Sequence, residues 1–214
     1  MNSKVGGLIA LNTRMTVCEL GDGGLLVLSP VALNAGLRAE LESLGSVRGI
    51  VAPNLWHHLH LGSWLAAYPE AEFFAPIGLA AKRPDLPEAR ELGTSFDAIF
   101  GEDLLRIPIA GVPKVAESLF FHYASRTLVV TDFCFQMTEA RGLTALYASL
   151  MGFRKKPGCP PIYRMAIKDE AAFRASLAPL RSLDISHLSM CHHGVLSNEP
   201  TASIAGILDR LGVD

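Results

Sequence analysis

Short apolar runs of strand length alternate along this chain with segments whose apolar residues recur at helical spacing. The runs Leu25–Leu28, 47–52 and 128–131 consist largely of Val, Leu and Ile, which favours buried strands. A Gly-Asp-Gly-Gly segment separates residues 15–20 from Leu25–Leu28. It predicts a hairpin, because glycine permits the backbone angles of a tight turn. The chain is therefore expected to open with two antiparallel strands.

Helical spacing follows this predicted hairpin. Leu37, Leu41 and Leu44 share one helical face, and Asn34 can cap the first turn. Residues 83–101 carry Pro, Gly and mixed charge, so we expect them to be the least regular part. Further helices are expected around 64–68, 78–82, 144–151, 169–180 and 201–211, and further strands at 71–75, 104–108, 118–122 and 186–190.

Strands that first form a hairpin and then alternate with helices predict a layered α/β protein. No linker or shift in composition divides the chain, so residues 1–214 are expected to form a single domain. Hydrophobic residues make up 50% of the chain and charged residues 19%. This composition supplies a substantial core and excludes a disordered chain.

Charge and hydropathy narrow the expected partners. Lys and Arg (19) nearly balance Asp and Glu (21) without a long run of either sign, so we expect no nucleic-acid partner. The clearest basic spot, Arg154-Lys155-Lys156, is typical of exposed charges at a helix exit. No apolar run reaches the ~18 residues of a membrane span, and no signal-peptide pattern is evident, so we expect no membrane partner. Four scattered cysteines without a Cys-x-x-Cys pair are typical of a reduced, cytoplasmic protein.

Five of the seven histidines lie in two short stretches, His57-His58-Leu59-His60 and His192-His193-Gly194. Neutral imidazole is the commonest protein metal ligand, so metal binding is the first hypothesis. Each stretch follows an apolar strand, and Asp132 follows a third one. Strand ends hold side chains in place while the adjoining loops leave them accessible. Imidazoles together with a carboxylate suit zinc, iron or manganese.

The order of these segments resembles the metallo-β-lactamase superfamily. That fold begins with a hairpin, continues with a strand that ends in a His-x-His-x-Asp-His loop, and later has strands that end in a metal-bridging Asp and in His-Gly. The matching segments are Val51-Ala52-Pro53-Asn54-Leu55-Trp56-His57-His58, Val129-Val130-Thr131-Asp132 and His193-Gly194. The run Pro-Asn-x-x-His-His, followed by Tyr68-Pro69-Glu70-Ala71 and Ala75-Pro76, resembles a branch with a degenerate metal-binding loop. The resemblance implies a four-layer αββα sandwich.

The resemblance also implies a reduced set of metal ligands. Residues 53–56 occupy positions where the superfamily places ligands, and residues 110–113 replace its Gly-His element. The matched candidates for metal ligands are His57, His58, Asp132 and His193, with Asn54, His60 and His192 as their neighbours. Such a set would hold at most one zinc, iron or manganese ion, because a two-metal site needs more donors and a bridging ligand.

Two functions remain open from the sequence. The first is a metallo-β-lactamase-like hydrolase of unknown substrate, whose single metal ion lowers the pKa of a bound water. The second is a metal-free, non-catalytic relative that binds a small molecule or a protein partner in the remaining pocket. No catalytic side chain can be assigned at this stage.

Two weaker hypotheses concern neighbouring residues. Cys191 stands beside His192 and could be an activated nucleophile, although a cysteine at a strand end is more often a small buried apolar residue. The apolar Phe133, Phe135 and Met137 could form a partner contact, which would make the protein a homodimer. The alternative for these three residues is a buried connection between a strand and a helix.

Overall fold

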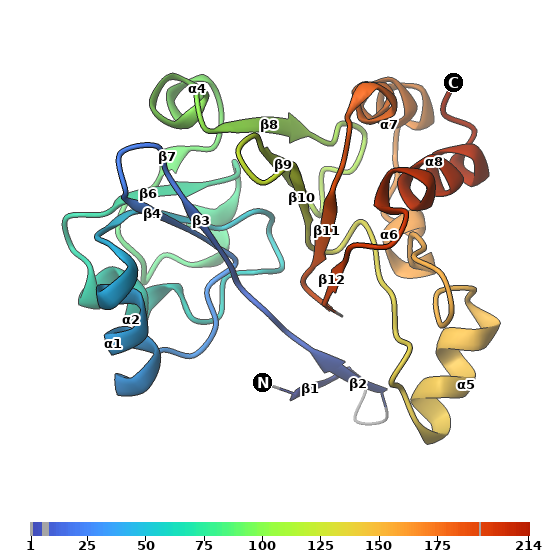
Figure 1. The fold of residues 1–214 in the computed structure, drawn as a ribbon, viewed down its shortest axis with the longest axis horizontal. Helices are drawn as coiled ribbons and strands as arrows, with labels where there is room; N and C mark the ends of the chain where they lie inside the picture. Colours follow the sequence, from blue (N-terminus) through green and yellow to red (C-terminus); the bar gives the residue numbers. More distant parts are fainter. Residues whose placement is uncertain (1, 6–8, 193) are drawn as a thin grey trace.

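Two mixed β-sheets face each other, and helices cover both outer faces, as Figure 1 shows. The computed structural model describes residues 2–5, 9–192 and 194–214, with side chains from residue 13 onward. The layers follow the order helix, sheet, sheet, helix, which confirms the expected αββα sandwich. A separate antiparallel ribbon of β1 (Asn2–Val5) and β2 (Ile9–Asn12) precedes the sandwich.

The first sheet combines the predicted hairpin with parallel strands. Its order is β3 (Thr16–Glu19), β4 (Leu25–Leu28), β5 (Val47–Val51), β6 (Glu72–Ala75) and β7 (Arg90–Glu91). β3 pairs antiparallel with β4, as predicted, and the other neighbours pair parallel. Leu25 and Val27 pack under the outer helices, whereas Leu26 and Leu28 pack against the second sheet. Burial on both faces explains why this strand is a continuous apolar run.

The second sheet has the order β12 (Val195–Leu196), β11 (His187–Met190), β10 (Thr127–Val130), β9 (Ser118–His122) and β8 (Leu104–Pro108). Only the β10–β11 pair is parallel. Within β10, Val129 points toward the first sheet, while Leu128 and Val130 point to the outer helices. The period of two along the strand therefore supplies two separate cores.

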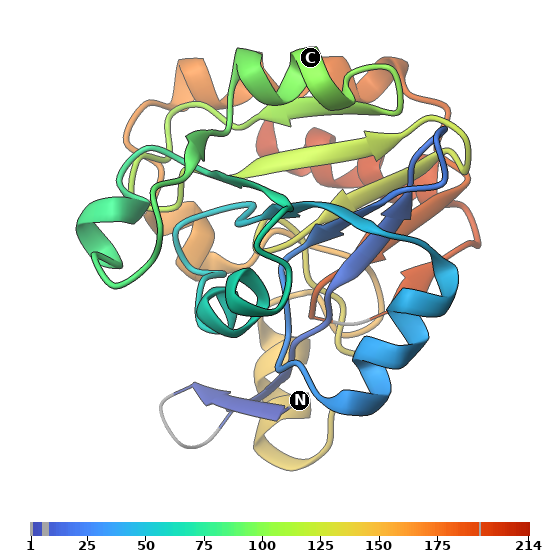
Figure 2. The same cartoon turned by 90° about the vertical axis from the view of Figure 1, so that its left-hand side faces the viewer.

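The helices fall into two outer layers. The first sheet is covered by α1 (Ala35–Leu44), α2 (Leu61–Ala67) and α3 (Leu79–Lys82). The second is covered by α6 (Pro161–Met165), α7 (Glu170–Leu177), the 3₁₀ turn η1 (Ala178–Ser182) and α8 (Pro200–Leu211). α5 (Gly142–Leu150) lies apart from both layers, near the β1–β2 ribbon (Figures 1 and 2). Every helix in the described part of the chain is too short or too polar to cross a bilayer.

Local sequence signals located several element ends correctly. The Asn34 side chain accepts a hydrogen bond from Leu37 N at 2.9 Å, which confirms the predicted cap of α1. The predicted helix at 169–180 is α-helical only to Leu177, and its last turn is the 3₁₀ segment η1, which contains Pro179. Proline has no N–H to donate and so disfavours a continuing α-helix.

Residues 83–101, expected to be the least regular part of the chain, nevertheless include regular elements. They contain β7 and the helix α4 (Thr94–Phe100), which lies between the two sheets at one edge. Only Phe96 and Phe100 form the apolar face of α4, and glycines flank the helix on both sides. Two apolar positions are too few for a periodic signal, so tertiary packing of these rings determines the helix.

We expect Phe96→Ala to lower the free energy of unfolding by about 3–5 kcal/mol, because it opens a cavity in the core between the sheets. The Phe96 ring is fully buried and contacts Phe74, Phe100 and Phe120 edge-on or tilted. Equilibrium urea unfolding measures the change. Ile99→Ala on the exposed side of α4 is the matched control, and a similar loss for both variants would contradict the assignment.

Candidate metal centre

Four strand ends meet at one edge of the sandwich and bring the candidate side chains together. β10 and β11 run parallel, with Val130 opposite Met190. Asp132 lies two residues after Val130 and His192 two residues after Met190, so both side chains come at the same level. β4 and β5 also run parallel, with Leu28 opposite Val51. Parallel pairing places the carboxyl ends of neighbouring strands at the same edge, which is where loops carry functional groups in α/β folds.

The carboxylate of Asp132 is the hub of the site. His57 donates from Nε2 to Asp132 Oδ2 at 3.1 Å, and His192 donates from Nε2 to Oδ1 at 3.3 Å. The side chains of all three residues are only 7–8% exposed. The two imidazole rings lie edge to face with centroids 5.4 Å apart. One buried carboxylate therefore orients two histidines that are far apart in the sequence.

Asn54 ties the loop after β5 to this hub. Its side-chain amide donates to Asp132 Oδ2 at 2.7 Å and to Thr131 Oγ1 at 3.0 Å. Its carbonyl oxygen accepts from the backbone N–H groups of Trp56 and His57 at 2.8 and 2.9 Å. The fully buried Asn54 thus shapes the turn that presents His57.

Charge pairing determines the protonation of these groups. Burial opposes ionisation of Asp132, but the charges and hydrogen bonds of His57 and His192 outweigh it and hold the pKa of Asp132 well below its usual range. Burial by itself would lower the pKa of both histidines, yet their hydrogen bonds and attraction to Asp132 raise it. The buried ions are therefore stable only as a group.

Ser29 and Cys191 lie on the opposite side of the His57 ring from Asp132. Ser29 Oγ lies 2.6 Å from His57 Nδ1, and Cys191 Sγ lies 3.6 Å from the same atom. Cys191 also donates its S–H to the carbonyl of Arg14 at 3.0 Å. Burial raises the pKa of the Cys191 thiol, but the neighbouring His57 more than offsets this effect, and the net shift is downward. Ser29 has a φ of 57°, a left-handed conformation that costs energy for a residue other than glycine and often marks functional sites.

The donor atoms of His57, Cys191 and His192 all lie within 4.8 Å of one another. The structure thus brings together His57, Asp132, His192 and Asn54 from the predicted set, and it adds Cys191 and Ser29. Cys191 stood out in the sequence only as a neighbour of His192, and nothing in the pattern singled out Ser29.

His58 contacts residues outside this cluster. His58 Nδ1 is 3.3 Å from Arg83 Nη1, and its backbone carbonyl accepts from the same guanidinium nitrogen at 2.6 Å. Partial burial and the nearby charges of Lys82 and Arg83 lower the pKa of His58. His60 occupies the position before α2 and makes no capping hydrogen bond with its side chain. His193 lies outside the described residues.

A buried glutamate supports the turn that carries Asp132, and sequence reasoning missed it. Glu117 Oε1 accepts hydrogen bonds from Thr131 N at 3.0 Å, from Thr131 Oγ1 at 2.6 Å and from Asp132 N at 3.1 Å. Burial, reinforced by the charge of Asp132, raises the pKa of Glu117 to about 7. The only signal in the sequence is a charged residue directly before the apolar strand β9.

Comparison with known proteins supports the fold and identifies a family. A metallo-β-lactamase from Pontibacter korlensis is 12% identical, with a TM-score of 0.61 over 100% of this chain and 93% of that one. A putative diflavin flavoprotein from Nostoc sp. PCC 7120 is 12% identical, with a TM-score of 0.63 over 95% of this chain and 84% of that one. The metallo-β-lactamase FIM-1 from Pseudomonas aeruginosa, in its mono-zinc form, is 9% identical, with a TM-score of 0.59 over 100% of this chain and 90% of that one.

These similarities show a protein of the metallo-β-lactamase fold, as the order of segments predicted. A model of the family described as "Domain of unknown function (DUF4336)" matches residues 4–151, and the chain belongs to that family. A search of curated protein sequences finds no match.

We expect the stability of the protein to fall as the pH rises from about 4.5 to about 7, because of Glu117. The ordinary pKa of 4.5 applies in the unfolded chain, while the folded chain holds its proton up to a pKa of about 7. In this window the folded state binds more protons than the unfolded state, so a higher pH favours unfolding. The contribution is at most about 3 kcal/mol.

Urea unfolding across this pH range, compared between wild type and Glu117→Gln, isolates the effect. The difference in unfolding free energy should shift in favour of the variant as the pH rises. Glu102→Gln at an exposed position should follow the wild-type curve. A difference between wild type and Glu117→Gln that does not change with pH would show that Glu117 does not titrate this way.

Proposed function

We propose that this protein is a metallo-β-lactamase-like hydrolase with one metal ion, bound by His57, Cys191 and His192. The observation that carries the proposal is the convergence of their three donor atoms within 4.8 Å, with Asp132 bonded to Nε2 of both histidines. A hydrogen bond from a ligand histidine to a carboxylate is the usual support of a protein zinc site.

The donors fit zinc in type, and the His57–Cys191 pair also fits it in spacing. Imidazole nitrogen and thiolate sulfur are both zinc ligands, and catalytic zinc takes three protein ligands and keeps its fourth position open. Bond lengths of about 2.0–2.1 Å to nitrogen and 2.3 Å to sulfur in a tetrahedral site place the two ligand atoms about 3.5 Å apart. His57 Nδ1 and Cys191 Sγ are 3.6 Å apart. The lowered pKa of Cys191 also favours the thiolate that a metal needs.

This ligand set differs from the one expected from the sequence. The sequence predicted Asp132 as a metal ligand and His192 as a neighbour of the ligands. In the proposed site, His192 is a ligand, and Asp132 orients His57 and His192 by accepting from their Nε2 atoms. Because Asp132 accepts from Nε2 of His57, a bound metal ion would displace the proton from Nδ1, the nitrogen that faces Cys191. Asn54 keeps Asp132 in place by donating to the same oxygen as His57.

A zinc ion held there would supply a water of lowered pKa and polarise a carbonyl or phosphoryl oxygen of the substrate. The hydroxyl of Ser29, on the Nδ1 side of His57, is placed to hydrogen-bond a group at the open position. Burial of the three ligands excludes bulk water and strengthens these electrostatic contacts. Iron and manganese remain alternatives, although a thiolate ligand favours zinc.

We expect the wild-type protein to bind one equivalent of Zn²⁺ or Co²⁺, and Cys191→Ser to lose the sulfur-to-cobalt charge-transfer absorption. Asp132→Asn should retain this absorption but lower metal affinity by about 10–100-fold, because Asp132 acts through the histidines. Absorption spectroscopy and calorimetric titration measure both effects. Cys159→Ser and His58→Gln are the controls, since neither side chain belongs to the cluster. A wild-type protein that holds no metal after supplementation rules out the metal centre and, with it, metal-dependent hydrolysis.

A second candidate function is metal-free binding of an anionic small molecule with an apolar body. The observation that favours it is a groove of about 480 Å³ beside the loop that carries His57. Its lining is apolar except for two lysines: Leu55, Trp56, Lys82, Lys114, Ile162, Met165 and Ala166. This volume lies in the usual range for small-molecule sites.

If the groove binds such molecules, metal-depleted protein should bind the probe 1-anilinonaphthalene-8-sulfonate, and Lys82→Gln/Lys114→Gln should weaken binding by about 10-fold. Lys168→Gln, at an exposed position outside the groove, should leave the affinity unchanged. Fluorescence titration gives the affinities. Equal binding by wild type and the double variant would remove the groove as the site.

A further inference from the structure

Helix α5 exposes large apolar side chains instead of the polar face expected of a surface helix. Leu143, Leu146 and Leu150 are 63%, 56% and 71% exposed. Met151 directly after the helix is also exposed. A surface helix of a globular protein normally turns polar residues outward. Clustered exposed apolar side chains mark an interaction surface rather than ordinary scatter.

The three leucines lie on the side of α5 directly opposite the protein. At 100° per residue they fall within an arc of about 60°, while Thr144, Ala145 and Ala148 occupy the opposite side. Those three residues are the buried ones. The helix is therefore apolar on two faces: one packs on the body of the protein and the other faces solvent. We call the leucine side, with Met151, the leucine face.

Positive charge predominates in the segments that flank the leucine face in the sequence. Residues 138–158 contain four basic side chains, Arg141, Arg154, Lys155 and Lys156, and a single acidic one, Glu139. The whole chain, in contrast, carries a net charge of −2. Among the described residues, none of the four basic side chains forms an ion pair. Their charge is thus available to a partner.

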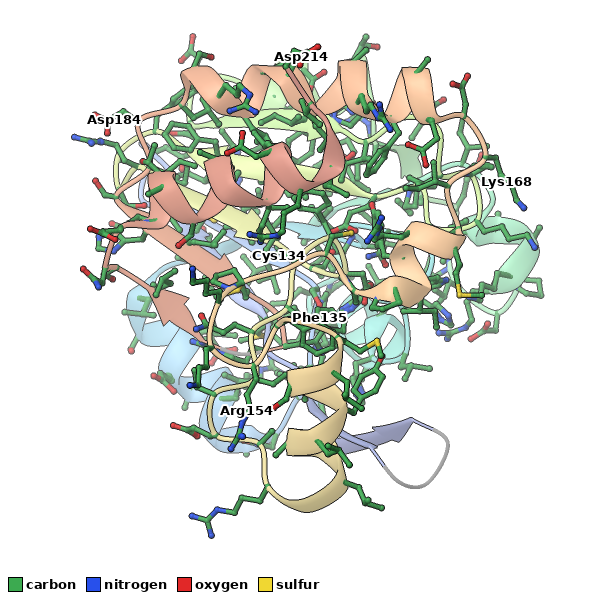
Figure 3. The ribbon with its side chains drawn as sticks, turned by 90° about the vertical axis from the view of Figure 1, so that its right-hand side faces the viewer. Cys134, Phe135, Arg154, Lys168, Asp184 and Asp214 are labelled. Carbon is green, nitrogen blue, oxygen red and sulfur yellow. The ribbon has the colours of Figure 1, made fainter. Side chains whose placement is uncertain are left out.

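α5 is held firmly and lies at an end of the molecule. Figures 1 and 2 show α5 beside the β1–β2 ribbon, away from the outer helix layers, and Figure 3 shows Arg154 in the loop after the helix. The rings of Tyr147 and Phe153 contact each other, and Phe153 contacts Phe135. Phe135 in turn lies against His192 with ring centroids 4.5 Å apart. The leucine face is therefore fixed relative to the candidate metal centre.

We propose that the leucine face and its basic rim dock the protein on an anionic lipid surface. Apolar side chains at the centre enter the boundary of the acyl chains, while Lys and Arg at the rim attract anionic headgroups. This goes beyond the proposed function, and it differs from the expectation of no membrane partner, which rested on the absence of a run long enough to span. The helix lies on the membrane and does not cross it.

The charges favour a lipid surface over a second copy of the chain. Basic residues stand at both ends of α5, with Arg141 before it and Arg154, Lys155 and Lys156 after it. In a symmetric dimer the same patch meets itself, so either orientation of the paired helices would bring basic ends together. A homodimer through the predicted contact is also disfavoured, because Phe133, Phe135 and Met137 are buried within the protein.

Co-sedimentation of the full chain with vesicles tests the proposal. We expect binding to vesicles of phosphatidylcholine mixed with phosphatidylglycerol, weaker binding at high salt, and little binding to phosphatidylcholine alone. Leu146→Ser/Leu150→Ser should lower the partition coefficient at least about 10-fold, and Lys155→Gln/Lys156→Gln about 10- to 30-fold. Leu44→Ser, at an equally exposed leucine on α1, is the matched control and should bind like wild type.

Circular dichroism confirms that each variant is folded before comparison. Absence of binding to anionic vesicles, or binding that both double variants retain, would overturn the proposal. Light scattering distinguishes the competing occupant: a dimer that Leu146→Ser/Leu150→Ser dissociates would assign the leucine face to a second copy. Metal content is measured in parallel, so loss of the metal centre and loss of lipid binding are separate results.

Discussion

The buried carboxylate of Asp132 is the interaction on which the arrangement of this site depends. An isolated carboxylate in the core would be costly, and partners on every side offset that cost. His57 and His192 donate to separate oxygens, Asn54 adds a third hydrogen bond, and Glu117 anchors the turn from below. Removing His57, His192 or Asn54 leaves part of the charge of Asp132 without compensation, whereas Glu117 acts by holding the backbone of the turn. The cluster therefore behaves as a single unit, which explains why residues from four strand ends adopt one common geometry.

The pairing of the strands brings the residues of this cluster together, although they are far apart in the sequence. The parallel β10–β11 pair brings Asp132 and His192 to the same level, and the loop after β5 crosses from the other sheet to deliver His57. Both sheets are buried on two faces, so their strands cannot shift by one residue without moving apolar side chains from one core to the other. The fixed pairing of the strands thus keeps the side chains of the site at constant positions relative to one another. Helix α5 lies outside this constraint, as the β1–β2 ribbon does, and its outward face packs against none of the three cores of the sandwich.

The fold was predictable because its signals are local. Apolar runs gave β3 to β6 and β8 to β11, the four-residue glycine-rich turn gave the first hairpin, and Asn34 gave the start of α1. The helix α4 was missed because its two inward phenylalanines are stabilised by aromatic rings on the two sheets, and these contacts leave no local pattern in the sequence. The candidate site was predictable at the level of segments, since His57, Asp132 and His192 all follow apolar strands. It was not predictable which neighbour turns inward: His57 meets Asp132, while the adjacent His58 meets Arg83.

The sequence by itself determined the main strands of both sheets, most of the covering helices, the composition of the cores and the positions where polar side chains leave the strands. These features follow from side-chain periodicity and turn residues, which act over a few neighbouring positions. Only the tertiary structure decided that Cys191 and Ser29 join His57, that Glu117 lies beneath Asp132 and that three leucines of α5 face solvent. Those outcomes depend on contacts between segments that are distant in the chain. A side chain's partner across such a distance is set by how layers pack, and no local pattern encodes it.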